Sequence, residues 1–379
     1  MGSCLCNRTS SLSLAPAPFL SALIGSTILF VLLESLSKPA APKEDPVSYS
    51  RRFQVIAFLF LFSMLFLSCG SEHSADEFYV LVSANVHVPY WRAAGAGFSQ
   101  AANQLKVKAD FVGPDEYDPA AEKAAFDKAL TKKPTGILVS AADAKLLKDS
   151  IASAVAAGVP VITVDSDAPD SKRLYFIGTN NYQAGVTGGQ RLATELKGKG
   201  NVVVFTMPGQ ANLAERLRGY RDALENSPQI KIVRVVDIAG DPRVAFDTTN
   251  EILGKEKNKV DAFVCLEALA GKEVANVLSE NKVTDKVVIA MDTDPDTLDW
   301  VRKGVIAATI SQKPYTMTYV GLRMLDDLYH HKLATLSADW SKDSFAPVPA
   351  FVDTGSALVD KNNVESFIQA NQSATGAQK

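Results

Sequence analysis

Short apolar segments rich in β-branched residues alternate with amphipathic segments, and this alternation constrains the fold more than any other feature. The strand candidates lack a polar face and lie at residues 78–83, 136–139, 159–164, 202–205, 232–236, 262–265, 287–291 and 307–310. The helix candidates lie at residues 120–130, 144–156, 184–196, 213–224, 244–253 and 271–280. Strands that are apolar throughout are typical of parallel sheets covered by helices on both faces. The pattern predicts an α/β fold of the doubly wound kind.

The number of strand–helix units predicts two lobes rather than one. About nine units are too many for one small sheet in a chain of 379 residues. Gly158-Val-Pro160 is a helix stop followed by a buried strand, and residues 175–181 have the pattern of a strand that leaves one lobe for the next.

The segment before the first strand has the pattern of an export signal. Residues 51–70 read RRFQVIAFLFLFSMLFLSCG, in which two arginines precede an apolar run too short for a membrane span of about 20 residues. A small residue before Cys69 resembles the lipobox of bacterial lipoproteins, although Phe66 stands where leucine is usual. We expect residues 47–69 to be a lipoprotein signal peptide, Cys69 to be acylated and residues 70–77 to be a tether. An uncleaved anchor and plain secretion are the alternatives.

Residues 1–46 contain a second apolar stretch, which has little purpose upstream of a complete signal. We expect translation to start near Val47 and residues 1–46 to be a non-native extension.

Cysteine, histidine and charge usage argue against several kinds of site. Beyond Cys69 the chain has one cysteine, Cys265, so neither a disulfide nor a cysteine-based zinc site is expected within one chain. The four histidines are scattered, and the pair His330–His331 is interpreted as an exposed helix end, so no metal site is expected. A net charge of −3 with dispersed lysines and arginines gives no reason to expect nucleic acid as a partner.

Polar and aromatic side chains follow the predicted strands, where ligands of open parallel sheets bind. Hydroxyl groups of polyols both donate and accept, so they match carboxylates, amides and guanidinium groups, while aromatic rings cover the C–H faces of sugars. For a single residue, such as Asp294 before Pro295, a helix N-cap is the better interpretation. As a whole the set predicts a binding cleft. Its members include Asn85, His87, Tyr90, Trp91, Asp165, Gln210, Asn212, Arg216, Glu267, Asp292 and Gln312.

Motifs of enzymes are incomplete in this chain. Gly95-Ala-Gly97 departs from the dinucleotide fingerprint because Gln100 stands at the third glycine, so we interpret it as close helix packing. Residues 292–296 depart from a calcium loop, since Thr297 and Lys303 replace its glycine and glutamate. Nucleophile–histidine sets are absent from the strand ends. We therefore predict a binding protein without catalytic residues or cofactor.

Five segments together resemble the ribose-type periplasmic sugar-binding proteins over residues 78–351. They are Val161-Ile-Thr-Val-Asp165, Phe176-Ile-Gly-Thr-Asn-Asn181 with Ala184-Gly185, Glu215-Arg-Leu-Arg-Gly219, Val288-Ile-Ala-Met-Asp292-Thr-Asp-Pro-Asp296 and Ala307-Ala-Thr-Ile-Ser-Gln312-Lys-Pro314. The resemblance implies two lobes joined by a three-segment hinge, with crossings near residues 179–180, 312–313 and 348–349. Regulators of the lactose-repressor type share this fold, but they carry a helix-turn-helix where this chain has an export signal.

The resemblance also implies roles for individual residues. Tyr90 and Trp91 are expected to stack on the sugar, and four polar residues are expected to bind its hydroxyls: Asp165, Arg216, Asp292 and Gln312.

Three positions depart from the ribose binders. Ser166 replaces an arginine, Glu267 replaces an asparagine, and Val88 replaces an asparagine whose space His87 could reach. Because the cleft loses a positive charge and gains a negative one, ribose itself is not expected. Either Glu267 pairs with Arg216, or the ligand offers more donors or a positive charge. A neutral monosaccharide or polyol is the main hypothesis, and an amino sugar is the alternative.

We therefore expect a monomeric, exported, membrane-anchored periplasmic or cell-envelope lipoprotein that delivers its ligand to an ABC transporter permease. A receptor that signals to a membrane kinase or chemoreceptor remains an alternative, as does an enzyme on the same scaffold. The expected lobes are residues 78–179 with 313–348 and residues 180–312 with 349–371, followed by a flexible tail at 372–379.

Overall fold

The computed structural model describes the chain except for residues 1–72, 75, 257–258, 333–344, 346–347 and 375–379. The chain divides into two compact units, residues 1–71 and 72–379, and all described residues lie in the second. The predicted extension, the predicted signal peptide and Cys69 therefore lie outside the described residues. Of the tail predicted at residues 372–379, residues 375–379 also lie outside them, whereas residues 372–374 belong to the last helix. Among the helices that are described, none has the length and hydrophobicity needed to cross a bilayer.

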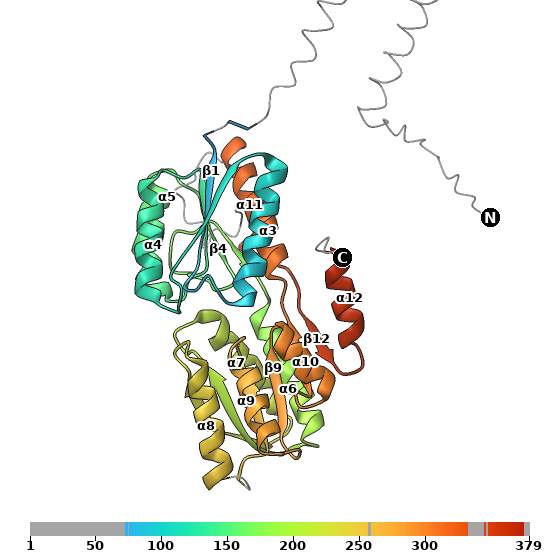
Figure 1. The fold of residues 1–379 in the computed structure, drawn as a ribbon. Coiled ribbons are helices and arrows are strands. Elements are labelled where there is room, and N and C mark those ends of the chain that lie inside the picture. Colours follow the sequence, from blue (N-terminus) through green and yellow to red (C-terminus); the bar gives the residue numbers. More distant parts are fainter. Residues whose placement is uncertain (1–72, 75, 257–258, 333–344, 346–347, 375–379) are drawn as a thin grey trace, which may run out of the picture. The chain divides into compact units, whose positions relative to one another are not determined.

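The first sheet of the second unit has six parallel strands in the order β11-β5-β4-β3-β1-β2. Its strands are β1 (Phe78–Val82), β2 (Lys108–Val112), β3 (Gly136–Val139), β4 (Val161–Val164), β5 (Phe176–Gly178) and β11 (Phe351–Asp353). Its helices are α3 (Pro89–Leu105), α4 (Pro119–Thr131), α5 (Ala144–Ala156) and α11 (Pro314–His330). Helices α3 and α11 pack together on one face, and α4 and α5 cover the other (Figure 1).

The second sheet also has six strands, in the order β12-β10-β9-β8-β6-β7, and only β12 runs antiparallel. Its strands are β6 (Lys199–Thr206), β7 (Gln229–Asp237), β8 (Ala262–Cys265), β9 (Val287–Met291), β10 (Ala308–Ser311) and β12 (Ala357–Asp360). Its helices are α6 (Asn181–Glu195), α7 (Ala211–Leu224), α8 (Pro242–Lys255), α9 (Ala270–Glu280), α10 (Pro295–Lys303) and α12 (Val364–Ala374). Helix α6 packs on α7, and α9 packs on α8 and α10.

The predicted doubly wound α/β class is confirmed, because every apolar segment assigned as a strand is one. Aspartates begin several helices as the side-chain pattern predicts. The Asp294 carboxylate accepts the backbone N–H of Thr297 at 3.2 Å and caps α10, so the N-cap interpretation of this residue is confirmed. Strand β2 was not predicted, because it lies at the edge of the sheet and its sequence, KADFV, contains charged residues among the apolar ones.

The chain crosses between the two sheets three times: at residues 179–180, at 312–313 and at 354–356. The expected third crossing at residues 348–349 was wrong. After Pro349 the chain first adds β11 to the edge of the first sheet, where Phe351 stacks on Phe176 with ring centroids 5.3 Å apart. Neighbouring crossings are hydrogen-bonded, since the backbone N–H of Thr354 donates to the carbonyl oxygen of Gly178 at 2.8 Å.

Glycines allow α3 to approach α11 closely. A Cβ atom on Gly97 would lie 2.1 Å from the carbonyl oxygen of Tyr315, and one on Gly95 would lie 2.9 Å from the Phe111 ring. These distances confirm that Gly95-Ala-Gly97 serves helix packing.

We predict that Gly97→Ala lowers the free energy of unfolding by about 1–3 kcal/mol, because the added methyl group must push two helix backbones apart. Gly254→Ala is the matched control, since Gly254 is an exposed helical glycine with open space around its Cβ position. That change should leave stability unchanged or raise it by up to about 1 kcal/mol. Urea unfolding measures both values, and equal effects of the two substitutions would contradict the packing argument.

Candidate functional site

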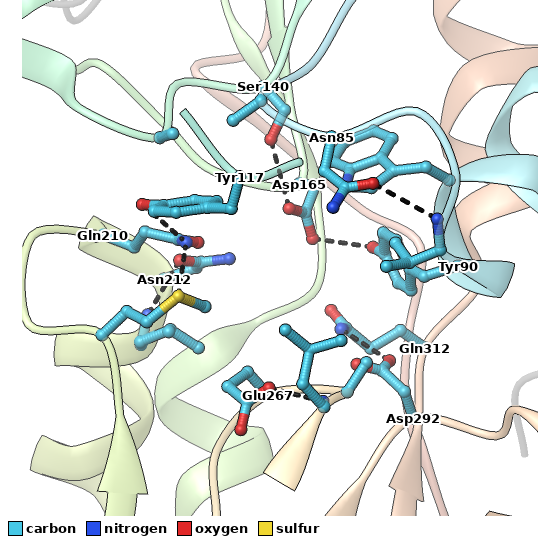
Figure 2. A pocket seen from close by; sticks show the side chains of 18 of the residues that line it. Asn85, Tyr90, Tyr117, Ser140, Asp165, Gln210, Asn212, Glu267, Asp292 and Gln312 are labelled. Atoms are coloured by element: carbon cyan, nitrogen blue, oxygen red, sulfur yellow. Dashed lines mark hydrogen bonds between the residues drawn. The ribbon is translucent and has the colours of Figure 1, made fainter. Parts of the chain in front are cut away.

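A cavity lies where the carboxyl ends of the two sheets face each other, and side chains of both lobes line it (Figure 2). It holds about 650 Å³ of empty space, part of it open to solvent. The first lobe contributes Asn85, Tyr90, Trp91, Tyr117, Ser140 and Asp165 to the polar and aromatic lining. The second contributes Gln210, Asn212, Arg216, Glu267, Asp292 and Gln312.

Asp165 presents its carboxylate to the cavity from the end of β4. Figure 2 shows it between two hydroxyl donors, Tyr90 at 2.7 Å from Oδ1 and Ser140 at 3.2 Å from Oδ2. The residue is 8% exposed and its backbone φ is 64°, in the left-handed region. Aspartate enters this region more readily than most residues, and such conformations gather at functional sites.

Asp292 occupies the corresponding position in the second lobe, at the end of β9. Its φ is 69°, its exposure is 7%, and its Oδ1 accepts the side-chain N–H of Gln312 at 2.9 Å. The Thr309 hydroxyl donates to the Asp292 carbonyl oxygen at 2.7 Å and so holds the turn. Each sheet thus has, at its carboxyl end, a buried aspartate whose own left-handed backbone conformation directs its side chain to the same cavity.

Arg216 is buried on α7 and is held by three neutral acceptors. Its Nε donates to Asn181 Oδ1 at 2.8 Å, and its two terminal nitrogens donate to the Leu266 carbonyl and to Gln312 Oε1 at 2.7 and 2.8 Å. Gln312 also accepts the Thr179 hydroxyl at 2.8 Å. Because residues 179 and 312 lie in two of the crossings, the hinge and the cavity share one hydrogen-bond network.

Glu267 does not form the ion pair with Arg216 that we considered from the sequence. Its carboxylate instead accepts the backbone N–H groups of Leu269 and Ala270, the latter at 3.1 Å, at the start of α9. Burial raises the pKa of Glu267 to about 7, opposed by these two backbone hydrogen bonds. The helix start therefore holds this carboxyl group without a cationic partner.

The cavity gathers three carboxyl groups around one guanidinium group. Burial raises the pKa of Asp165 and raises that of Asp292 to about 7, while the positive charge of Arg216 opposes both shifts. Near neutral pH Glu267 and Asp292 can therefore hold or release protons, and a ligand that donates hydrogen bonds to the carboxyl groups favours their charged forms.

Two aromatic side chains from the start of α3 form one wall of the cavity. The rings of Tyr90 and Trp91 meet edge to face, with centroids 5.3 Å apart and planes at 82°. Trp91 also lies 6.4 Å from the Phe111 ring, which supports it from behind. The wall combines apolar ring surface with the hydroxyl that binds Asp165.

The structure brings together seven of the nine residues that the resemblance to the ribose binders placed in the cleft. These are Tyr90, Trp91, Asp165, Arg216, Glu267, Asp292 and Gln312. His87 lies outside the lining, because its side chain is exposed and contacts Asp115 at 2.9 Å. Ser166 is also outside it. The backbone turn at Asp165 directs the Ser166 side chain into the protein, where its hydroxyl is fully buried and has no partner among the described residues.

Five further polar residues line the cavity. Asn85, Gln210 and Asn212 belong to the strand-end set that the sequence predicted, whereas Tyr117 and Ser140 were not predicted. Ser140 directly follows β3, so the strand-end rule would have found it. Tyr117 follows β2, the strand that the polar edge sequence concealed.

Tyr117 connects the two lobes directly. Its hydroxyl accepts the side-chain N–H of Gln210 at 3.2 Å, and its side chain packs on the core of the second lobe. Gly240 makes room for it, because a Cβ atom there would lie 2.5 Å from the Tyr117 side chain.

A buried carboxyl group supports the cavity wall from behind. Glu122 on α4 is fully buried, and one of its oxygens accepts the backbone N–H of Ala142, a lining residue, at 3.1 Å. Burial raises the pKa of Glu122 well above its usual value. This buried carboxyl group thus fixes the loop that follows β3.

Several known sugar-binding proteins are similar to this chain. The family model described as periplasmic binding protein domain matches residues 78–332. The D-allose-binding periplasmic protein of Escherichia coli is 25% identical over 274 residues, which cover 69% of this chain and 87% of the relative. An arabinose binding protein from Geobacillus stearothermophilus is 35% identical, with a TM-score of 0.64 over 77% of this chain and 99% of that one. A carbohydrate transporter solute binding protein from Agrobacterium radiobacter, in complex with D-arabinose, is 26% identical, with a TM-score of 0.71 over 79% and 99%.

The raised pKa of Asp292 predicts a pH-dependent effect of Asp292→Asn on stability. The folded protein keeps a proton up to pH about 7, whereas the unfolded chain releases it near pH about 4. The stability from this group is therefore complete below pH about 4 and is lost as the pH rises through 7. Across this window, the free energy of unfolding of the variant should rise relative to that of the natural protein by on the order of 1 kcal/mol per pH unit.

Denaturant unfolding at pH 5 and pH 8 measures this gain. Asp296→Asn is the control, since Asp296 is an exposed residue in the first turn of α10 and should show no comparable trend. A gap between Asp292→Asn and the natural protein that stays constant from pH 5 to pH 8 would contradict the assignment.

Proposed function

We propose, because the chain belongs to the family of periplasmic binding protein domains, that it captures one neutral monosaccharide or polyol and delivers it to an ABC-type permease. Members of this family are binding proteins rather than enzymes, as the relatives' names show. The observation that carries the proposal is the pair of buried aspartates, Asp165 and Asp292, which end two separate sheets at one cavity.

Hydroxyl-rich molecules match the lining of this cavity. Carboxylates accept two hydrogen bonds or more, while the amide groups of Asn212 and Gln210 donate and accept. The rings of Tyr90 and Trp91 provide apolar surface for the C–H groups of a sugar. A purely apolar ligand would leave these buried polar groups without partners, at about 1–3 kcal/mol for each.

The contacts of Glu267 favour a neutral ligand over an amino sugar. Because two backbone N–H groups already hold this carboxyl group, the cavity does not depend on a positive charge from the ligand. Relatives of the chain are named for D-allose, ribose and xylitol, which include both sugars and a polyol. These names support the class of ligand, and the differences at Ser166 and Glu267 argue against ribose.

Binding is coupled to closure of the two lobes in this proposal. A ligand that contacts Asp165 and Asp292 together stabilises only the closed arrangement, in which Tyr117 also bonds Gln210. An affinity difference of about 5.5 kcal/mol would change the closed population from 1% to 99%. Two to four charge-assisted hydrogen bonds of about 1.5–3 kcal/mol each supply that difference. The permease would recognise the closed form.

The same proposal places the protein outside the cytoplasm and at a membrane. Export follows from the family, and anchoring follows from the sequence before Cys69, which fits lipoprotein processing. Residues 70–77 would then join the lipid to the first strand.

Arg216→Ala should weaken sugar binding by about 10–100-fold, because it removes the charged group nearest the carboxylates and the partner of Gln312. Arg218→Ala is the matched control on the same helix, since Arg218 is exposed and pairs with Glu215 at 2.6 Å. Calorimetry with neutral monosaccharides and polyols, acidic sugars and amino sugars measures both effects and identifies the ligand. Equal affinities of the two variants would remove Arg216 from the site, and binding of acidic sugars alone would refute the neutral ligand.

Cys69→Ser should abolish lipid attachment and leave the protein unprocessed. Metabolic labelling with a radioactive fatty acid, followed by membrane fractionation, measures this. Cys265→Ser is the control, because Cys265 is buried inside the second lobe and should not affect labelling. Labelling of Cys69→Ser at the natural level would exclude Cys69 as the anchor.

A further inference from the structure

Four side chains with metal-binding atoms meet at the end of the first sheet opposite the cavity. His73 and Glu77 precede β1, while Asp326 and His330 lie one turn apart near the end of α11. One ligand atom from each of the four lies within 4.8 Å of the other three. The cavity is at the other end of β1, so this cluster is a separate feature.

The contacts inside the cluster join the amino-terminal segment to α11. His73 Nε2 lies 3.0 and 3.2 Å from the two carboxylate oxygens of Asp326. His330 Nε2 lies 3.4 Å from Glu77 Oε1. The two imidazole rings meet edge to face, with centroids 4.9 Å apart.

Glu77 is the observation that points to a ligand. It is 3% exposed, and its Oε2 has no hydrogen-bond partner in the described part of the chain. A buried carboxylate oxygen without a partner is costly, and such groups are usually paired or bound to a metal. A cation among the four side chains would satisfy this oxygen.

Neighbouring groups orient the cluster as they do in metal sites. His330 Nδ1 lies 3.0 Å from the backbone carbonyl oxygen of Asp326, and in the neutral tautomer that donates to this oxygen, Nε2 beside Glu77 is left to bind a metal ion. The buried Tyr79 hydroxyl donates to Asp326 Oδ1 at 3.1 Å. Metal-binding histidines and carboxylates commonly have such outer partners, which fix the tautomer and the orientation.

We propose that His73, Glu77, Asp326 and His330 bind one zinc ion. Two imidazole nitrogens and two carboxylates are ligands that zinc accepts, whereas calcium and magnesium prefer oxygen alone. The two carboxylates balance the charge of the ion. Ligand atoms about 2.0–2.1 Å from a tetrahedral zinc ion are roughly 3.3 Å apart, so the side chains need to draw together only slightly.

This site changes what we expected from the histidines. The sequence predicted no metal site, because His73 and His330 are far apart along the chain. The pair His330–His331 lies at an exposed helix end, as predicted, but the two side chains differ, since that of His330 is 25% exposed and that of His331 is 79% exposed. Zinc bound here would fasten residues 73–77, which follow the predicted lipid anchor, to α11 of the first lobe.

Metal analysis of the full-length protein in detergent tests the proposal. After chelator treatment and dialysis against zinc, the natural protein should bind one zinc ion more per chain than His330→Ala or Glu77→Gln. His331→Ala is the matched control, because His331 is the next residue but contacts Asp327 outside the cluster, and it should keep the zinc. Zinc bound by other thiols or histidines would contribute equally to the zinc content of every variant, so it does not affect the differences between them.

Two further variants guard against misfolding and define the outer partner. If His330→Ala does not fold, His73→Gln takes its place in the test. His73 lies before the first strand, so this substitution removes a ligand without changing the core. Tyr79→Phe should keep the stoichiometry but lower the zinc affinity about 10–100-fold, measured against a chromophoric chelator. Equal zinc content in the natural protein, Glu77→Gln and His73→Gln would overturn the proposal. That result would leave the cluster as an ion-pair network only.

Discussion

Burying three carboxyl groups beside one guanidinium group is the constraint on which the binding cavity depends. Each carboxyl group loses hydration, and the raised pKa values of Asp165, Glu267 and Asp292 express that cost. Arg216 offsets part of it without forming a direct ion pair to any described carboxylate, because its three hydrogen bonds go to neutral oxygens. The hydrogen bonds therefore fix the geometry of this polar site, while the single positive charge of Arg216 balances the three carboxyl groups only in part. Hydrogen-bond donors from a ligand can complete that compensation.

The geometry of parallel sheets explains how such a site forms between two lobes. Strands β4 and β9 both end in an aspartate with left-handed backbone, and the crossings carry Thr179 and Gln312 into the same network. Because Asp292 bonds Gln312 at one of the crossings, a change in the angle between the lobes would alter the contacts of Asp292, whereas Asp165 bonds Tyr90 and Ser140 inside the first lobe. In the proposed function, a ligand that contacts both aspartates couples the two lobes.

The sequence predicted the class of the fold and most of the cavity, because both follow from local patterns. Apolar runs marked the central strands, and the residues after them marked Asp165 and Asp292. The failures have physical causes. Strand β2 is half polar, so Tyr117 was missed; Ser166 turns inward because of the backbone at Asp165. The His73–His330 cluster forms from segments 257 residues apart, and no local pattern encodes such a contact. Strand β11 moved the third crossing because pairing at a sheet edge is a tertiary property.

The most direct measurement is a crystal structure of the protein with its bound ligand, identified by calorimetry. The account predicts one small hydroxyl-rich molecule whose hydroxyl groups donate to the carboxylates of both Asp165 and Asp292. It also predicts the ring of Tyr90 or Trp91 against an apolar face of that molecule. A ligand held by one lobe alone, or bound away from these two aspartates, would contradict the account.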